Sequence, residues 1–406
     1  PDAKVVLARD WIGAVPFHYM ITGNGDVISA NDVRALMSYP DYDYGRIRAV
    51  KAGHAVTIPL KGRFTEKDVQ ASRYTPSLYE LPEIKGTIEQ YGKAIRENLI
   101  AETEKRFNYA VKDGIPIAVA FSGGMDSFSV ALAINELGRI KDVEAFCINT
   151  DGQGSDWPNA QRAANHLGLE LHEVRASKQR TLEVVPKVVR LAELYHDYDI
   201  FCAVSCYLLG EEMKKRGVRA VFTGDGANEA FRDYTTWGGH MTNIDEIIES
   251  VEQGLRYLQG RKDSDPAQSP QQASGYAKSA SRGTKVFPHF GIDAFNPFVA
   301  KSTGGYIARI PLKLIARFEN GQPLWKRDIL RAAFPKPKVP EELFPLKTRM
   351  QDGVGTTDVI CHIRKMDLRK HAKYGVSGQA KYGVGSKDPY WKEENPDYYT
   401  DLFKKY

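Results

Sequence analysis

A short segment in the first third of the chain combines the residue types that bind a polyphosphate. Residues 115–138 read IPIAVAFSGGMDSFSVALAINELG, which is an apolar run, the turn SGGMDS and an amphipathic stretch with helical spacing. Gly123 and Gly124 let the backbone approach an anion closely, and the amide groups that begin a helix point at it. Ser122 and Ser127 add hydroxyl donors. We therefore predict a loop that binds the pyrophosphate of ATP.

The acidic residue of this turn suggests the metal that accompanies ATP. Asp126 is placed to hold a Mg²⁺ ion that bridges phosphate oxygens. The simpler interpretation is a tight strand-to-helix turn in which Ser127 is the N-cap, but six matching residues in a strand–turn–helix context favour the nucleotide. The chain has neither GxxxxGK[ST] nor a GxGxxG after a strand, so the pattern excludes kinase-type P-loop proteins and dinucleotide dehydrogenases.

The composition is that of a globular protein of two or three domains. The 406 residues are 42% hydrophobic and 26% charged, which leaves ample core. A net charge of +5 suits an anionic substrate such as ATP, and without a concentrated basic run we do not expect nucleic acid as a partner. Four cysteines without a CxxC pair favour a reducing compartment. Since no long apolar run or signal pattern is present, we expect a cytoplasmic protein without a membrane partner.

The elements that position the loop alternate regularly. Strands are predicted at 115–121, 143–149, 169–174 and 218–222, and helices at 128–137, 157–167 and 181–216. This alternation is expected of a parallel sheet covered by helices, so the predicted fold class is α/β with a doubly wound parallel sheet. ATP would then lie at the carboxyl ends of the strands, where the loop of residues 122–127 is found.

The flanking regions have other patterns. Residues 1–75 alternate short β-like runs with turn signals and are predicted to form a small β-rich segment. The main domain is expected over 84–360 and begins with a helix at 84–110. Residues 260–285 are rich in Ser, Gln, Gly and Lys and predict a mobile insertion that could act as a lid. In the C-terminal tail, 361–406, basic and aromatic residues could stack on bases, but their balance with acidic residues favours packing on the domain surface.

Two further segments carry a resemblance to a known family. They are VFTGDGANEAFRDY at 221–234 and LFPLKTRMQDGVG at 343–355. Together with SGGMDS, and in the same order and spacing, they resemble the synthetase domain of the asparagine synthetase family, whose relatives include β-lactam synthetases and lasso-peptide cyclases. Residues 295–311 and 325–343 resemble further segments of that domain. The resemblance covers 85–360 and implies the PP-loop of N-type ATP pyrophosphatases, an adenine nucleotide alpha-hydrolase-like fold, and the cofactors ATP and Mg²⁺.

The resemblance also implies roles for single residues. The nucleotide-binding positions are Ser122, Gly123, Gly124, Met125, Asp126, Ser127, Ile148, Gly224 and Asp225. Within this set the backbone of Ile148 would meet adenine, and residues 224–229 would wall the acyl-adenylate site. Lys347 falls on the family's lysine ahead of QDGVG, a cation thought to stabilise charge as pyrophosphate leaves. The alternative for Lys347 is a solvated surface lysine.

Two positions of the implied site depart from the family or stay open. Asn228 stands where the family places a second Mg²⁺-binding carboxylate; an amide oxygen can bind Mg²⁺ but lacks the charge, so Asp225 or Glu229 could compensate. A family acidic residue aligns with His196 or Asp197. His196 is accordingly a candidate base that deprotonates an amine, although a helix-end histidine in a hydrogen-bonded core is the simpler interpretation.

The N-terminal segment resembles only part of a family domain. Its sequence VVLARDWIGAVPFHYM is similar to the second half of a class II (Ntn-type) glutaminase domain. That family uses a cysteine directly after the initiator methionine as its nucleophile, whereas no cysteine precedes Cys147 here, so we do not expect this chain alone to hydrolyse glutamine. A partner chain or another protomer with the missing half would cover the exposed β edges, and a processed fragment of a longer protein fits equally.

Three function classes follow from these patterns. The first is an ATP-dependent carbon–nitrogen ligase that joins a carboxylate to AMP, releases pyrophosphate, and then transfers the acyl group to ammonia or an amine. Its variant is an intramolecular cyclase that forms a macrolactam or a β-lactam. The second class is a non-catalytic nucleotide-binding scaffold subunit, suggested by Asn228 and the partial N-terminal segment. The third, PP-loop enzymes that modify tRNA, is disfavoured because 221–234 and 343–355 match the amide-forming branch.

Overall fold

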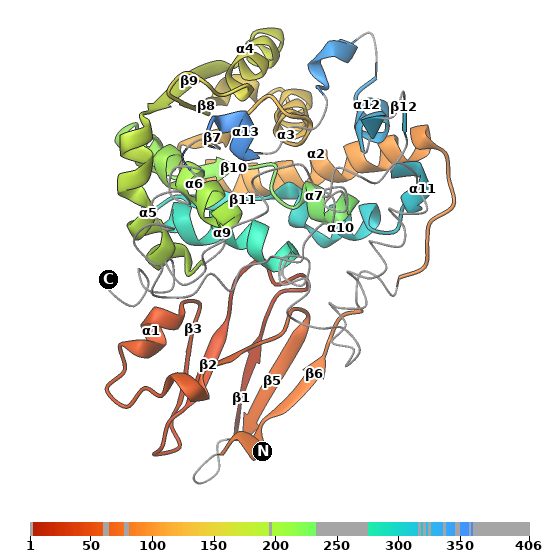
Figure 1. The fold of residues 1–406 in the computed structure, drawn as a ribbon. Helices are drawn as coiled ribbons and strands as arrows, with labels where there is room; N and C mark the ends of the chain where they lie inside the picture. The colour runs from red at the N-terminus through yellow and green to blue at the C-terminus, as the bar shows by residue number, and fades with distance from the viewer. Residues whose placement is uncertain are drawn as a thin grey trace.

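The protein consists of a small β-rich unit and a larger α/β unit, which lie one below the other in Figure 1. The computed structural model describes residues 3–59, 65–76, 81–194, 197–232, 275–315, 318–319, 322–323, 326–335, 338–345, 350–356 and 359.

The α/β unit is built on a five-stranded sheet. Its strands are β7 (Ile117–Ala120), β8 (Val143–Thr150), β9 (Glu170–Ala176), β10 (Ala220–Phe222) and β11 (Asp293–Phe295). All pairs are parallel, and the spatial order is β11-β10-β7-β8-β9. The chain therefore builds outward from β7 to β9, returns to the other side of β7 with β10, and places its topological switch point between β7 and β10.

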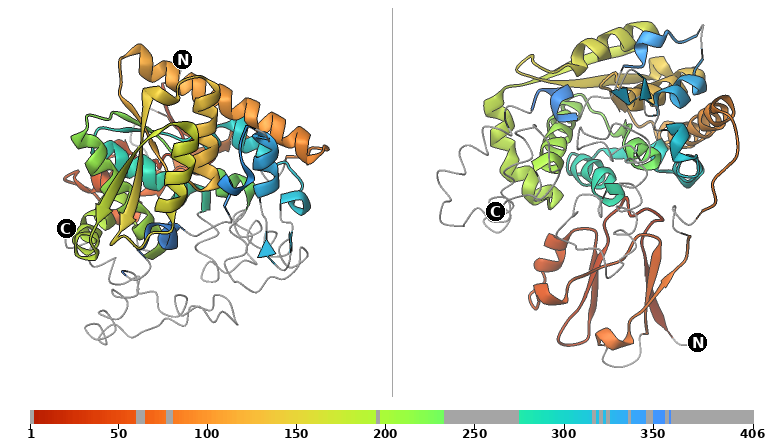
Figure 2. Two further views of the ribbon diagram at one scale, coloured as in Figure 1. Left: turned by 90° about the horizontal axis from the view of Figure 1, so that it is seen from above. Right: turned by 45° about the vertical axis from the view of Figure 1, so that its right-hand side comes forward.

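Helices cover both faces of this sheet (Figure 2). One face carries α2 (Ile88–Lys112), α3 (Met125–Glu136), α4 (Asp156–Leu167), α7 (Ala227–Phe231), α10 (Lys301–Ile307) and α12 (Arg327–Ala333). The other carries α5 (Lys178–Ala192), α6 (Asp197–Lys215), α9 (Gly275–His289) and α13 (Met350–Val354). Neighbouring residues of β7 serve different cores, since Ala118 packs with the second group and Val119 with the first. The predicted doubly wound α/β fold is confirmed.

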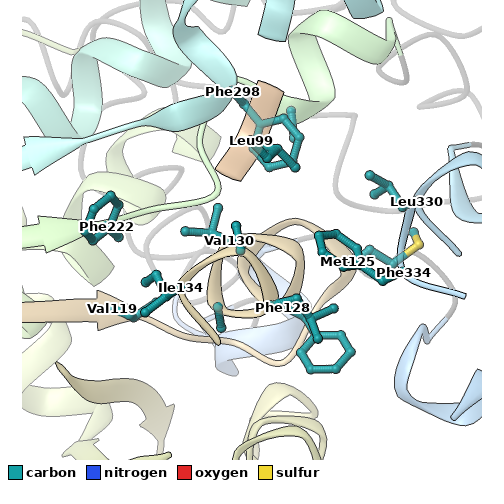
Figure 3. Close-up of a cluster of buried hydrophobic side chains, with 14 of the residues drawn as sticks. Leu99, Val119, Met125, Phe128, Val130, Ile134, Phe222, Phe298, Leu330 and Phe334 are labelled. Atoms are coloured by element: carbon teal, nitrogen blue, oxygen red, sulfur yellow. The ribbon is translucent and has the colours of Figure 1, made fainter. Parts of the chain in front are cut away.

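The helix after the first strand begins earlier than predicted. It starts at Met125, not at 128, so Asp126 and Ser127 lie in its first turn. The helix is apolar on nearly all sides, and Figure 3 shows Met125, Phe128 and Val130 pointing away from it in different directions. A helix buried all round belongs to the interior of a large domain. The loop that is predicted to bind pyrophosphate therefore leads into a buried central helix.

The N-terminal unit contains two antiparallel three-stranded sheets. One consists of β1 (Lys4–Ala8), β5 (His54–Pro59) and β6 (Gln70–Arg73); the other of β3 (Val27–Ala30), β2 (His18–Ile21) and β4 (Arg48–Ala49), followed in space by helix α1 (Val33–Met37). Leu7, Tyr19 and Ile58 belong to its small buried core. The prediction of a β-rich segment is confirmed. The short elements β4 and β6 were not predicted, because their side chains are exposed and leave no apolar alternation.

Short elements complete the described structure. They are α11 (Leu312–Ile315), β12 (Phe318–Glu319) and β13 (Gln322–Pro323), with 3₁₀ turns at Tyr44–Arg46, Glu66–Asp68, Ile140–Asp142, Pro297–Val299 and Glu341–Leu343. The predicted helix at 84–110 begins at residue 88, because a capping box between Thr87 and Gln90 sets its start. Among the described residues, no helix combines the length and apolarity needed to cross a membrane.

The insertion predicted to be mobile at 260–285 overlaps a helix at its C-terminal end, and its mobility stays a prediction. Helix α9 already begins at Gly275, so residues 275–285 are helical. The reason lies beyond the segment: Val286 and Phe287 are buried among apolar side chains of α5 and α6, and they anchor the helix whose polar first turns precede them. The rest of the segment, 260–274, and the predicted tail, 361–406, lie outside the described residues.

Specific polar contacts join the two units. Trp11 Nε1 donates to the carbonyl of Val299 at 3.1 Å, and Thr284 Oγ1 donates to the carbonyl of Ala14 at 3.0 Å. A partly buried ion cluster also spans the contact, and we call it the interface cluster: Lys285 and Glu193 of the α/β unit with Asp32 and Arg34 of the β-rich unit. Helix α9 supplies Thr284 and Lys285, and it lies on the side of the α/β unit that faces the β-rich unit (Figure 1).

Candidate active site

Two loops meet at the switch point of the sheet. Residues 121–127 follow β7, and residues 223–226 follow β10. A Cβ atom added to Gly224 would lie 2.8 Å from the backbone nitrogen of Ser127 and 2.9 Å from Cβ of Asp126, so only glycine allows the two loops to touch here. Ligands of doubly wound proteins bind where the strand order reverses. The geometry therefore brings the predicted pyrophosphate loop and the predicted wall of the acyl-adenylate site to the same place.

The pyrophosphate loop is shaped by its own glycines and serines. Gly123 has φ +69°, and a Cβ there would lie 2.4 Å from the backbone nitrogen of Ala160 in α4. Ser122 Oγ accepts from the amide of Gly124 at 3.2 Å and lies 3.1 Å from Ser127 Oγ, which donates to the carbonyl of Gly124. The first amide groups of α3 have no partner within the helix and carry its positive end. This arrangement is suited to phosphate oxygens.

A buried lysine joins the two loops, and the sequence patterns did not reveal it. Lys326 is 0% exposed, and its Nζ lies 2.7 Å from Oδ1 and 2.9 Å from Oδ2 of Asp126. The same ammonium donates to Oδ1 of Asn228 and lies 5.7 Å from the ring centroid of Phe231. We call Lys326, Asp126 and Asn228 the lysine bridge. In the sequence, Lys326 stands beside Arg327, as a solvated surface lysine would. Its position between apolar residues and the segment ILR at 329–331 was the one available signal.

The lysine bridge occupies the two side chains that were predicted to bind Mg²⁺. Asp126 and Asn228 are brought together as expected, but their oxygens accept hydrogen bonds from Lys326. Within the described ranges, no group of three or more His, Cys, Asp and Glu side chains is suited to a metal ion. In this arrangement the ammonium group contacts the oxygens of both side chains, and their role toward Mg²⁺ stays a prediction.

An acidic corner adjoins the bridge. Burial raises the pKa of Asp225 to about 6; Arg282 of α9 opposes this rise, and the buried Glu229 adds to it. Arg282 Nη1 also lies 3.4 Å from Oδ1 of Asp199. A Cβ at Gly283 would approach Oδ2 of Asp225 to 3.2 Å, which shows how closely α9 packs on this corner. The corner can hold or release a proton near pH 6.

The QDGVG segment packs against the end of β8. A Cβ at Gly353 would lie 2.4 Å from the carboxylate of Asp156, and one at Gly355, which has φ +81°, would lie 3.0 Å from the carbonyl of Thr150. Ile148 lies inside β8, is 3% exposed and pairs with Val174 of β9, two residues before the strand ends. The predicted adenine position and the QDGVG segment therefore lie at the same edge of the sheet.

Two predicted catalytic residues cannot be placed. Lys347 and His196 lie outside the described residues, and so does Tyr195 beside the latter. Asp197 begins helix α6. The roles of Lys347 and His196 stay predictions.

Comparison with known proteins agrees with the family resemblance. The sequence model of the asparagine synthase family matches residues 102–285. A glutamine-hydrolyzing asparagine synthetase 2 of Oryza sativa subsp. japonica is 24% identical over 430 residues, covering 100% of this chain and 64% of that protein. Asparagine synthetase B of Escherichia coli K12 is 22% identical over 364 residues, covering 86% of this chain and 58% of that protein. The chain thus spans less than two thirds of the length of these relatives.

A solved structure was also found, that of an NMN synthetase from Francisella tularensis. It is 13% identical and has a TM-score of 0.28, covering 48% of this chain and 94% of that one. This TM-score is too low to indicate a shared fold. The family match over 102–285 and the relatives that align along the chain show that this chain is similar to asparagine synthetases.

Proposed function

We propose that the chain is an ATP-dependent ligase that forms an amide bond through an acyl-adenylate. A carboxylate oxygen attacks the α-phosphorus of ATP, and the bond to the pyrophosphate leaving group breaks. Ammonia or an amine then attacks the acyl carbon, the bond to AMP breaks, and the nitrogen loses a proton to a base. The observation that carries this proposal is the contact of Gly224 with the first turn of α3, which joins the loops after β7 and β10 at one site.

The described residues supply binding and charge for this reaction. The first amides of α3, with Ser122 and Ser127 beside them, are suited to the departing pyrophosphate. Lys326 fixes one positive charge at the same loop, where negative charge develops as the α–β bond breaks. Lys347 is proposed as a second cation by position in the family. ATP is expected to arrive with Mg²⁺, its usual partner, and no step here depends on a side-chain site for that ion.

The nitrogen source is proposed to be ammonia or an amine supplied from outside this chain. In the described part, Cys147, Cys202 and Cys206 are buried. Burial raises the pKa of Cys147 and Cys206 and raises that of Cys202 to about 11, so these thiols are not reactive thiolates. A separate chain with glutaminase activity is a proposed partner, and the 1–75 segment is the proposed surface for it.

The test is a product assay with the full chain. ATP and Mg²⁺ are supplied with candidate acids, and aspartate comes first because the relatives are asparagine synthetases. Ammonium or glutamine is the nitrogen donor, while peptides with a free amine and carboxylate test cyclisation. We expect AMP, pyrophosphate and a product whose mass equals that of the acid plus the amine minus one water. ADP with inorganic phosphate would contradict the proposal.

A further inference from the structure

We propose that the ammonium group of Lys326 supplies the positive charge between Asp126 and Asn228, in place of a metal ion bound by these two side chains. Its role toward ATP rests on the function proposed above, but the bridge itself does not. The fixed positive charge of the nucleoside triphosphate site would then be a covalent part of the protein.

The ammonium group of Lys326 is enclosed by the protein. A lysine that is 0% exposed is costly unless its charge is paired and its donors are used. The Nζ atom donates to Oδ2 of Asp126 and to Oδ1 of Asn228, and it lies 2.7 Å from Oδ1 of Asp126. Both side chains that were predicted to bind Mg²⁺ therefore contact this ammonium group.

The residue at position 228 is uncharged. A divalent ion between two carboxylates is neutralised by both of them, whereas a single ammonium carries one charge, which one carboxylate such as Asp126 can neutralise. An aspartate at 228 would leave this enclosed group with one uncompensated negative charge, at the place where phosphates are to bind. Asn228 supplies an acceptor oxygen without that charge. The residue that looks like a defect in a metal site therefore matches a lysine site.

The backbone of Lys326 is anchored in the core. Lys326 is the N-cap residue of α12, whose Ile329 and Leu330 are fully buried in the main core. The ring of Phe231 lies 5.7 Å from the ammonium on another side. The position of the ammonium group is thus fixed by the backbone of α12 and by the neighbouring ring of Phe231. Any Mg²⁺ would enter on the phosphates of the nucleotide.

Metal binding without nucleotide tests the proposal. The probe is Mn²⁺ alone, titrated into the full chain and followed by electron paramagnetic resonance. We expect wild type and Asp126→Asn to give the same titration within about threefold, because Asp126 is held by Lys326. We also expect Asn228→Asp to bind Mn²⁺ no more than about threefold tighter than wild type, because the ammonium still separates the two carboxylates. Binding in wild type that Asp126→Asn abolishes would overturn the proposal, and so would tenfold tighter binding in Asn228→Asp.

Removing the lysine gives the complementary result. In the double variant Lys326→Met/Asn228→Asp, two carboxylates face each other without the ammonium, and we expect Mn²⁺ to bind at least about tenfold tighter than in Asn228→Asp. The matched control is Lys338→Met, which removes a lysine that is 74% exposed from the same region. An unchanged affinity in the folded double variant would overturn the proposal. If that variant fails to fold, the single variants still decide, and none of these readouts needs ligase activity.

Discussion

Two lysines of this protein, the partly buried Lys285 and the buried Lys326, have opposite settings. In the interface cluster, Lys285 contacts Glu193 and lies 3.4 Å from Asp32, and Arg34 completes a set of two positive and two negative groups. In the lysine bridge, Lys326 contacts the carboxylate of Asp126 and the uncharged amide of Asn228. The first cluster balances its charges among side chains, as a permanent contact between two units requires. The second lies against a glycine- and serine-rich loop at the switch point of the sheet, where an anion is expected.

The largest expected effect comes from removing the carboxylate of the lysine bridge. Asp126→Asn keeps the shape of the side chain but leaves Lys326 without its counter-charge, and we expect pyrophosphate formation to fall by about 10²–10³-fold. Pyrophosphate release by the purified protein is the measurement, with a thermal melt to verify folding. If this chain were only a scaffold, the activity of its partner would survive the substitution.

The interface cluster should respond in the opposite way. Lys285→Met leaves Glu193 buried without its main partner, and we expect a loss of about 3 kcal/mol in the free energy of unfolding. Pyrophosphate formation per folded molecule should stay within about threefold of wild type. Denaturant titration and the pyrophosphate assay measure the two quantities. A stable variant that has lost activity would show that the two lysines do not have separate roles.

The acidic corner should give a pH dependence of stability. The pKa of Asp225 is about 6 and lies above the ordinary carboxyl value of 3.8, so the folded state holds the carboxyl proton more tightly than the unfolded state. This contribution is present below about pH 4 and is lost as the pH rises through 6, by up to about 3 kcal/mol. Asp225→Asn should remove it and flatten the stability curve between these values. Equal slopes for variant and wild type would contradict the assignment.

The smallest effect is expected from the contact between the two loops. Gly224→Ala places a Cβ 2.8 Å from the backbone of Ser127 and must push the loops apart, so we expect about tenfold weaker ATP binding. Gly305→Ala is the matched control, because its Cβ would find no atom closer than 3.7 Å. Calorimetric titration with ATP compares the two variants. Equal affinities would show that the loop contact does not shape the nucleotide site.

The sequence predicted the sheet well, for a physical reason. Strands of a parallel sheet are buried on both faces, so residues 117–120 and 143–150 appear as apolar runs between helical patterns. The pyrophosphate loop was predicted because its glycines and serines act locally, within six residues. Exposed strands such as β6 leave no such pattern, and the start of α9 depended on apolar residues that follow it.

The lysine bridge could not be predicted from local patterns. Lys326 and Asp126 are 200 residues apart, and a lysine beside an arginine has the same appearance whether it is solvated or enclosed. Asn228 was identified as a departure from the family, but its meaning depended on a partner that only the tertiary structure supplies. The sequence therefore indicated where the site lies and left out the group that holds it together.

Four consecutive residues of α9 connect the two units of the molecule. Arg282 and Gly283 approach Asp199 and Asp225, whereas Thr284 and Lys285 contact Ala14 and Asp32 of the β-rich unit. Removal of residues 1–75 would therefore remove the contacts that Thr284 and Lys285 of this helix make with the β-rich unit. We expect the truncated protein to pack less tightly around Asp225, although no residue of the acidic corner is removed.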